Sequence, residues 1–280
     1  MINIGILKFG CIGATPLLEM IIDERADRED ISVKVIGTGS SMKPEACEAA
    51  TSQMIQERPD LVIIVSPNAA LKGPKLARKL LEKSTITTLT ISDAPASKAF
   101  YKKNEEGQKE PYTLVNQGFI IITADSMIGA RREFLDPTEM VMYNADVLKV
   151  LAATGVFRAL HEIIDSMIEG IKINKVLLPT KKITEDVVYE YGGYENPYAE
   201  AKAYAAFRMA KEVSGITTRA CFRESDSKRY IPLVAAGHEL MRSAALLVDE
   251  AREIEKSRDS VLRTSHKSDG KISERKELGK

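Results

Sequence analysis

Short apolar segments alternate with amphipathic segments along the first half of the chain. The apolar segments have strand length and are rich in residues that favour β-structure, and the amphipathic segments carry apolar residues at helical spacing. The predicted strands are Ile2 to Phe9, Ser32 to Thr38, Asp60 to Val65, Thr85 to Ile91 and Gly118 to Thr123, and the predicted helices are Pro16 to Asp27, Pro44 to Glu57 and Pro74 to Lys83. This alternation predicts an α/β fold with a doubly wound, mostly parallel, Rossmann-like sheet.

After residue 135 the pattern becomes mainly helical. Asp136-Pro137-Thr138-Glu139 supplies an N-cap residue, a Pro at the first helical position and an acid at the third, so a long helix is expected from here to about Ile173. Further expectations are a short helix with an exposed connection in Ala96 to Tyr112, helices from Asn196-Pro197 to about Val213 and from Pro232 to about Lys256, and short β segments, as a hairpin or a sheet edge, at Val187 to Tyr191 and Arg219 to Phe222.

These patterns divide the chain into three parts. We expect an α/β domain with a strand-end ligand cleft in residues 1–135 and a helical part with a small β segment in residues 136–256. Residues 257–280 form a polar, basic tail, whose composition cannot bury much apolar area alone. We expect this tail to be either disordered or ordered by packing on a neighbouring subunit.

Composition and charge narrow the classes of partner. The chain has 280 residues, and 40 Lys and Arg balance 40 Asp and Glu, so no general positive field attracts nucleic acid or an acidic membrane. The longest apolar runs fall short of the roughly 20 residues that span a bilayer, and the chain enters its first strand without a leader pattern. Three widely spaced cysteines fit a reducing compartment. We therefore expect a cytoplasmic protein that binds neither nucleic acid nor a membrane.

Ligands of an open α/β sheet bind beyond the carboxyl ends of the strands, so the turns there are the first candidates. The first turn contains Gly10, Cys11, Gly13 and Thr15, where two glycines let backbone approach a ligand and the next helix offers N–H groups to an anion. A plain strand-to-helix turn with Thr15 as N-cap explains these residues equally well. The spacing is G-x-x-G-x-T, and Ile36-Gly37-Thr38-Gly39 lacks both an acid for a ribose and an Arg cluster for a 2′-phosphate, which disfavours NAD and NADP.

Three further turns carry small or charged residues. These residues are Ser66, Pro67 and Asn68 after the third strand, Asp93, Ala94 and Pro95 after the fourth, and Asp125, Arg131, Arg132 and Glu133 after the fifth. Small residues with single polar groups suit a close-fitting planar ligand, although the same types also favour turns. The charged group suits an anionic ligand, and a salt-bridge network between the two halves of the chain is the competing explanation.

Other patterns for catalysis or metal binding fail in the sequence. His238-Glu239 is not followed by the second His of a zinc motif, and His161 and His266 have no partner at ligand spacing, so we predict no metal. The sequence contains no P-loop and no G-x-S-x-G turn, and Cys11 shows no sign of an activating His, so covalent catalysis is not expected.

Longer motifs place the chain near a known family. The motifs are Asp23 to Asp30, Gly129 to Pro137, Tyr143 to Asp146, Leu151 to Arg158, Glu195 to Ala199, Arg229 to Pro232, Asp249 to Glu253 and Val261 to Thr264. They closely resemble F-420-dependent methylenetetrahydromethanopterin dehydrogenases, and the similarity covers nearly the whole chain.

The resemblance implies an enzyme of archaeal one-carbon metabolism, in methanogenesis or its reverse. It implies reversible hydride transfer between methylenetetrahydromethanopterin and the deazaflavin coenzyme F-420, in a homohexamer built as a trimer of dimers. No catalytic acid or base is expected, because the cofactor supplies the reactive carbon and the protein aligns two rings. Two alternatives stay open: an NADP-dependent version of the reaction, and a non-catalytic protein that binds the pterin or the deazaflavin.

The resemblance also implies where the ligands bind. F-420 is expected at the first three turns, and the substrate side is expected at Lys8, Asp125, Arg131, Arg132 and Glu133. Both ligands carry anionic tails, which suit the cations and the helix N-termini after Gly13 and Pro95, while Asp125 or Glu133 suits the amide-amine edge of the pterin.

Overall fold

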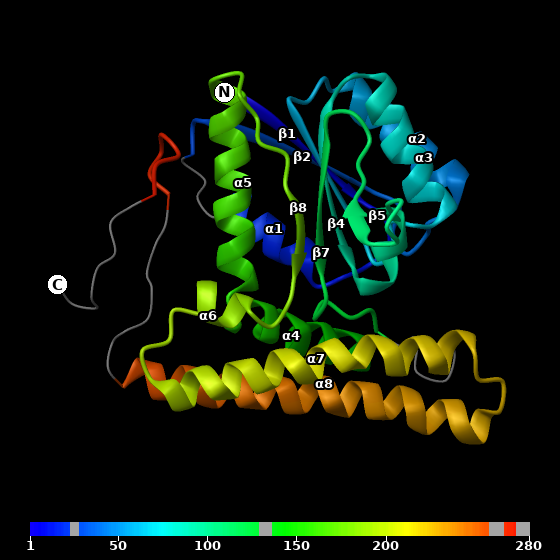
Figure 1. Cartoon of the computed structure of the whole chain (residues 1–280), viewed down its shortest axis with the longest axis vertical. Coiled ribbons are helices and arrows are strands. Elements are labelled where there is room, and N and C mark those ends of the chain that lie inside the picture. The colour runs from blue at the N-terminus through cyan, green and yellow to red at the C-terminus, as the bar shows by residue number, and fades with distance from the viewer. Residues whose placement is uncertain (23–27, 129–135, 258–265, 273–280) are drawn as a thin grey trace.

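A six-stranded parallel sheet forms the centre of the molecule (Figure 1). The computed structural model describes residues 1–22, 28–128, 136–257 and 266–272. The sheet contains, in spatial order, β2 (Ile31–Gly37), β1 (Ile2–Lys8), β3 (Leu61–Ser66), β4 (Thr87–Asp93), β7 (Gln117–Ile122) and β8 (Thr180–Ile183). The five predicted strands and the doubly wound architecture are confirmed, and the strand order is the flavodoxin-like variant of that architecture.

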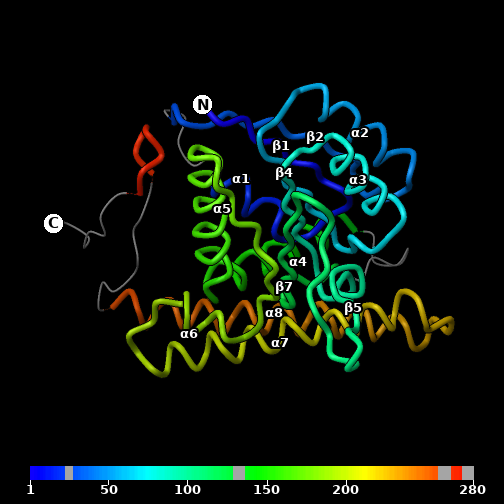
Figure 2. Tube along the Cα trace, turned by 45° about the horizontal axis from the view of Figure 1, so that its top comes forward, coloured from blue at the N-terminus to red at the C-terminus, as the bar shows by residue number. Residues whose placement is uncertain are grey.

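Different helices cover the two faces of the sheet (Figure 2). Side chains alternate between the faces along β3, where Ile63 and Val65 join one apolar cluster and Val62 and Ile64 join the other. The first cluster lies under α1 (Ala14–Ile22) and α5 (Val156–Lys172), and the second under α2 (Pro44–Gln56) and α3 (Lys72–Lys83). Covered on both faces, β3 is a continuous apolar strand, as buried parallel strands are.

A pair of long antiparallel helices crosses the carboxyl edge of the sheet (Figure 1). They are α7 (Pro197–Phe222) and α8 (Ser227–Lys256), and α4 (Pro137–Ala153) packs on both. A Cβ on Gly237 would lie 2.9 Å from Thr217 Cγ2, so the backbone of α8 packs closely against this side chain of α7. Among the described residues, α8 alone is long and apolar enough to cross a membrane, which is weak evidence because a core helix of a soluble protein passes the same test.

The long helix expected from Asp136 to about Ile173 is in fact two helices. Asp136 caps α4 as predicted, and its carboxylate accepts the Thr138 N–H at 2.7 Å. The helix breaks at Gly155, which has φ of +94°, and a Cβ there would lie 2.7 Å from the backbone of Val187. Only glycine combines this backbone angle with so close an approach.

Both predicted β segments of the second half are helical. Val187–Tyr191 forms the short helix α6, and the Gly192 N–H donates to Val188 O at 2.9 Å. Arg219 to Phe222 is the last turn of α7, which continues well beyond Val213. β-branched residues favour strands only weakly, and here the helical packing decides. The small β segment of this half is β8, which pairs with β7 and therefore belongs to the main sheet.

Two further boundaries differ from the prediction. The short helix expected after β4 is the 3₁₀ helix η1 (Ala94–Ala99). The exposed connection expected after it is instead a hairpin of β5 (Tyr101–Lys103) and β6 (Lys109–Pro111). Helix α8 begins at Ser227, where Asp226 accepts the Lys228 N–H at 3.0 Å, so Pro232 lies inside the helix and does not open it. A good N-cap sets the start, and Pro near the first turns is tolerated.

Candidate active site

The strand order places a topological switch point between β1 and β3. The chain leaves β1 through α1 to β2 on one side, and returns through α2 to β3 on the other side of β1. Ligands of doubly wound folds bind outside the carboxyl ends of the strands at such a point. All six strands are parallel, so the turns after β1, β3, β4 and β7 lie at the same edge.

The turns after β1 and β3 meet at Gly10 and Pro67. Gly10 has φ of +84°, and its N–H donates to Gly39 O at 3.0 Å. A Cβ on Gly10 would lie 3.0 Å from Pro67 Cδ, so both the backbone angle and the available space call for glycine. Cys11 is exposed beside this contact, whereas Pro67 is buried.

Hydrogen bonds tie the turn after β3 to β4. Ser92 Oγ donates to Ser66 O at 2.6 Å and accepts the Ala69 N–H at 3.1 Å. Asn68 Oδ1 accepts the Ala70 N–H at 3.1 Å. Ser66 and Ser92 are fully buried and Asn68 is half-buried, so Ser66 shapes the turn and Asn68 reaches its surface.

Asp125 holds the first helix in place. It follows β7 with a fully buried side chain; Oδ1 accepts the Gly13 N–H at 2.6 Å and Oδ2 accepts the Ala14 N–H at 2.7 Å. Burial raises the pKa of this carboxyl to about 6, against the lowering effect of the two N–H groups. The N–H groups after Gly13, where an anionic ligand tail was expected, thus already bind a carboxylate of the chain itself.

Asp93 forms a second buried carboxyl at the end of the neighbouring strand. It is 1% exposed and accepts hydrogen bonds from the Ala94 N–H and, at 3.2 Å, from Ser214 Oγ on α7. Burial and the charge of Asp125 raise the pKa of Asp93 well above its ordinary value, while the Ala94 hydrogen bond lowers it. Both buried carboxyls therefore keep their protons to a higher pH than exposed carboxyls do.

The sequence candidates did not include the side chains that the helices add beneath these strand ends. Tyr143 on α4 donates to Ser126 O at 2.9 Å, and its ring centroid lies 4.8 Å from that of His238 on α8. His238 Nδ1 in turn lies 2.8 Å from Glu139 Oε1. Burial raises the pKa of Tyr143 well above its ordinary value. Tyr143 lies in one of the family motifs, and this was the only sign in the sequence that it could belong to the site.

The remaining candidates have varied surroundings. Lys8 Nζ lies 3.0 Å from Glu19 Oε1, so its charge is already paired. Thr15 lies within α1 and does not cap it; it is 5% exposed, and its hydroxyl has no hydrogen-bond partner among the described residues. Ala94 is half-buried and Pro95 is exposed on η1. The structure does not describe Arg131, Arg132 and Glu133, which lie in the gap at residues 129–135.

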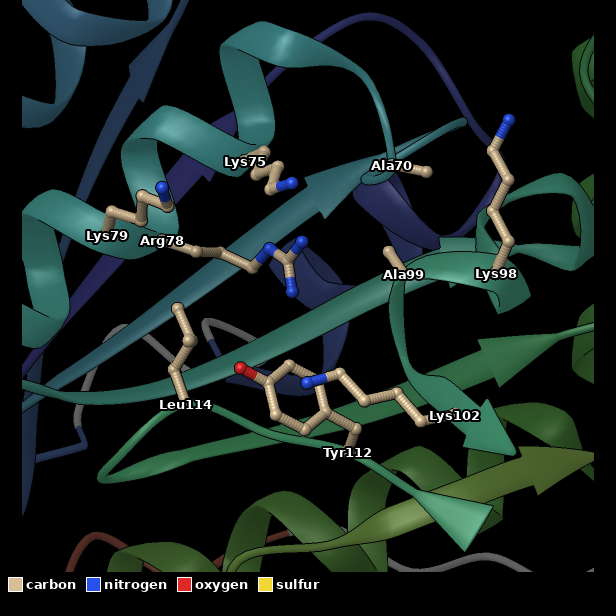
Figure 3. A pocket seen from close by; sticks show the side chains of 9 residues that line it. All are labelled: Ala70, Lys75, Arg78, Lys79, Lys98, Ala99, Lys102, Tyr112 and Leu114. Carbon is tan, nitrogen blue, oxygen red and sulfur yellow. The ribbon is translucent and has the colours of Figure 1, made fainter. Parts of the chain in front are cut away.

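A basic pocket of about 420 Å³ lies beside the turn after β3 (Figure 3). Its lining, drawn from the described residues, contains five cations and no acid: Ala70, Lys75, Arg78, Lys79, Lys98, Ala99, Lys102, Tyr112 and Leu114. Figure 3 shows Lys75 and Arg78 extending from α3 toward Lys102 and Tyr112, and Lys102 Nζ lies 3.1 Å from the centroid of the Tyr112 ring. The cations come from α3, η1 and β5, so they do not form a compact motif from which the sequence could have predicted the pocket.

Arg78 is the buried member of this pocket. It is 5% exposed, and its guanidinium lies 4.5 Å from the centroid of the Phe100 ring while Nη2 donates to Ala69 O at 3.3 Å. Burial lowers its pKa to about 10, which leaves the group charged at neutral pH. Arg78 therefore fixes the back of the pocket to the turn after β3.

A cluster of possible metal ligands lies away from the carboxyl edge of the sheet. His161 and His266 do have a partner at ligand spacing, because the fold brings both beside Asp165. The three residues are far apart or one helical turn apart in the sequence, so no motif reveals them.

The raised pKa of Asp125 gives a testable prediction. A carboxyl whose pKa is about 6 in the folded chain, against 3.8 ordinarily, binds its proton more tightly when folded. Folding stability relative to Asp125→Asn should therefore fall by up to about 3 kcal/mol as the pH rises from about 4 to about 6. Urea unfolding of both proteins across this range measures the difference, and a difference that grows with pH would contradict the assignment.

Comparison with known proteins gives one consistent family over the whole chain. A sequence model of methylene-5,6,7,8-tetrahydromethanopterin dehydrogenase matches residues 2–280. The F-420-dependent methylenetetrahydromethanopterin dehydrogenase of Archaeoglobus fulgidus is 53% identical over 274 residues, which are 97% of this chain and 96% of that protein. The protein of the same name from Methanocaldococcus jannaschii is 46% identical over 280 residues, covering 99% and 98%.

A solved structure extends the agreement to three dimensions. It is that of an F-420-dependent methylene-tetrahydromethanopterin dehydrogenase in complex with methylene-tetrahydromethanopterin and coenzyme F-420. The TM-score is 0.90 at 44% sequence identity, covering 99% of this chain and 98% of that chain. This chain therefore belongs to the methylene-5,6,7,8-tetrahydromethanopterin dehydrogenase family.

Proposed function

We propose that this chain is an oxidoreductase that transfers a hydride reversibly between methylenetetrahydromethanopterin and coenzyme F-420 in archaeal one-carbon metabolism. The observation that carries this proposal is the match along the full length to a relative whose structure holds both ligands. When bound, F-420 supplies the ring carbon that takes up or returns the hydride.

The carboxyl edge of the sheet is suited to binding F-420. At the switch point the chain presents Gly10 and Cys11 next to Pro67, and the Met42 side chain lies beside the same contact. The basic pocket begins at Ala70, two residues beyond Asn68, and its cations suit an anionic tail. A planar ring at the switch point and a tail in the basic pocket would thus lie along one continuous edge.

The protein's own residues act by positioning. Asp125 fixes the turn after β1 on α1, and Asp93 fixes the start of η1 while it binds Ser214 of α7. Because both oxygens of Asp125 accept backbone N–H groups and the side chain is fully buried, we assign it to this role in preference to the edge of the pterin. Arg131, Arg132 and Glu133 keep the substrate-binding role that the family resemblance implies.

The cofactor assignment has a direct test. Purified chain mixed with methylenetetrahydromethanopterin and oxidised F-420 should bleach the deazaflavin absorbance, and a parallel sample with NADP should show no reduction. Activity with NADP alone would overturn the cofactor assignment. If neither cofactor is reduced but either ligand binds measurably, the chain would be a non-catalytic binding protein.

The basic pocket has a separate test. Lys75→Ala and Lys102→Ala should each raise the KM for F-420 about fivefold and leave kcat nearly unchanged, because a cation that holds a remote tail contributes equally to ground-state and transition-state binding. Lys83→Ala is the matched control, since Lys83 is an exposed cation at the end of α3 outside the pocket lining. A raised KM for the pterin in place of F-420 would assign the pocket to the other ligand.

We also propose that the enzyme works in the cytoplasm as a homohexamer, a trimer of dimers. Exposed apolar side chains on α4 and α8, Val141, Met142 and Leu246, offer surface for subunit contacts. Light scattering of the purified chain should give the mass of six chains, and a stable monomer would contradict the proposal.

A further inference from the structure

Three metal-ligating side chains converge where the C-terminal segment meets α5. His161 and Asp165 stand one turn apart on α5, and His266 begins the segment 266–272. His161 Nε2 lies 3.2 Å from His266 Nε2, and Asp165 Oδ2 lies 2.9 Å from His266 Nε2 and 3.4 Å from His161 Nε2. His161 Nε2 also lies 3.5 Å from His266 Nδ1. Each residue therefore offers one possible ligand atom, and these three atoms lie within 4.8 Å of one another.

The cluster is built into the fold and is not a chance surface contact. His266 is fully buried, His161 is 9% exposed, and the two rings meet edge to face with centroids 4.6 Å apart. The spacing of four residues puts His161 and Asp165 on one face of α5. The segment 266–272 is held independently, since the Glu29 N–H donates to Ser268 O at 2.8 Å and Gly270 packs against the Asp30 carboxylate.

We propose that His161, Asp165 and His266 bind one divalent first-row transition ion, of the Zn²⁺ type, which fastens the segment 266–272 to α5. Imidazole nitrogen and carboxylate oxygen are the ligands such ions take, and two ligands on a tetrahedral ion with bonds of about 2.0–2.1 Å lie about 3.3 Å apart. The three separations, from 2.9 to 3.4 Å, bracket that value. Three protein ligands leave one position of the ion for water.

Hydrogen bonding to Asp165 is the competing explanation for this geometry. With a proton on both Nε2 atoms, each ring can donate to Asp165 Oδ2, which lies 2.9 Å from His266 and 3.4 Å from His161. A cation bound by all three residues would replace both of these hydrogen bonds, so metal binding itself has to be measured.

The proposed site is separate from the site of hydride transfer. It uses α5 and the C-terminal segment, which lies beside α5 in Figure 1, and none of the residues at the strand ends. The ion would hold the segment 266–272 on α5, which covers one face of the sheet. If no ion binds there, the proposed hydride transfer is not affected.

The first experiment uses Co²⁺ as the probe. The full chain is purified, stripped with a chelator and titrated with Co²⁺, and bound metal is counted after dialysis. One equivalent per chain, with visible bands of a nitrogen and oxygen site that Zn²⁺ abolishes, is the expected result. Absence of tight binding, or the near-ultraviolet absorption of a thiolate-bound cobalt, would overturn the proposal, the latter because it would point to the cysteines.

Variants locate the ion. His266→Gln and Asp165→Asn should weaken binding by more than the roughly 10–100-fold that loss of an outer partner costs. Glu169→Gln, which removes an exposed carboxylate one turn further along α5, should bind Co²⁺ as the unaltered chain does. Equal affinity in His266→Gln, shown to be folded by its circular dichroism, would overturn the assignment.

A second readout follows the segment itself. Trypsin cleavage after Lys267 and Lys271 should be slower with Zn²⁺ in the unaltered chain and insensitive to Zn²⁺ in His266→Gln. If Zn²⁺ does not change the rate of cleavage in either protein, the ion does not fasten the segment 266–272 to α5.

Discussion

The functional edge of this protein depends on one buried contact, the carboxylate of Asp125 on the first turn of α1. Residues more than a hundred positions apart meet there, because Asp125 follows β7 and the Gly13 and Ala14 N–H groups follow β1. A Cβ on Gly13 would overlap Val147 of α4, so the same point also sets how closely α4 packs. The buried charge is tolerated because two N–H groups and the positive end of a helix face it.

That contact has a consequence for chemistry. The acids that the sequence places at the strand ends, Asp93 and Asp125, face the interior and bind backbone and Ser214. They organise the turns that meet a ligand, while the exposed or cationic groups, Cys11 and the basic pocket, remain at the surface. This division suits a reaction in which the cofactor carries the reactive carbon and the protein contributes alignment.

The helices of the second half complete this edge. Helices α4, α7 and α8 bring Tyr143, Ser214 and His238 under the strand ends. Helix α5 covers one face of the sheet, and β8 adds a strand at its edge. Glycine allows close approaches in this half of the chain, for example at Gly155 beside α6 and at Gly237 between α7 and α8. One apolar cluster runs through strands and helices of both halves, so the strand-end turns are held from two sides.

The sequence by itself determined the strands, the doubly wound class and the family, since strand-length apolar runs, Pro at helix starts and long motifs are local signals. It also located Asp93 and Asp125 at strand ends, because parallel strands place their carboxyl ends together. Only the tertiary structure decided that Asp125, and not Thr15, caps α1, that Val187–Tyr191 is helical, that five dispersed cations share one pocket, and that His161 meets His266. Each of these depends on contacts between residues distant in the chain, and local propensity is too weak to specify which distant groups will meet.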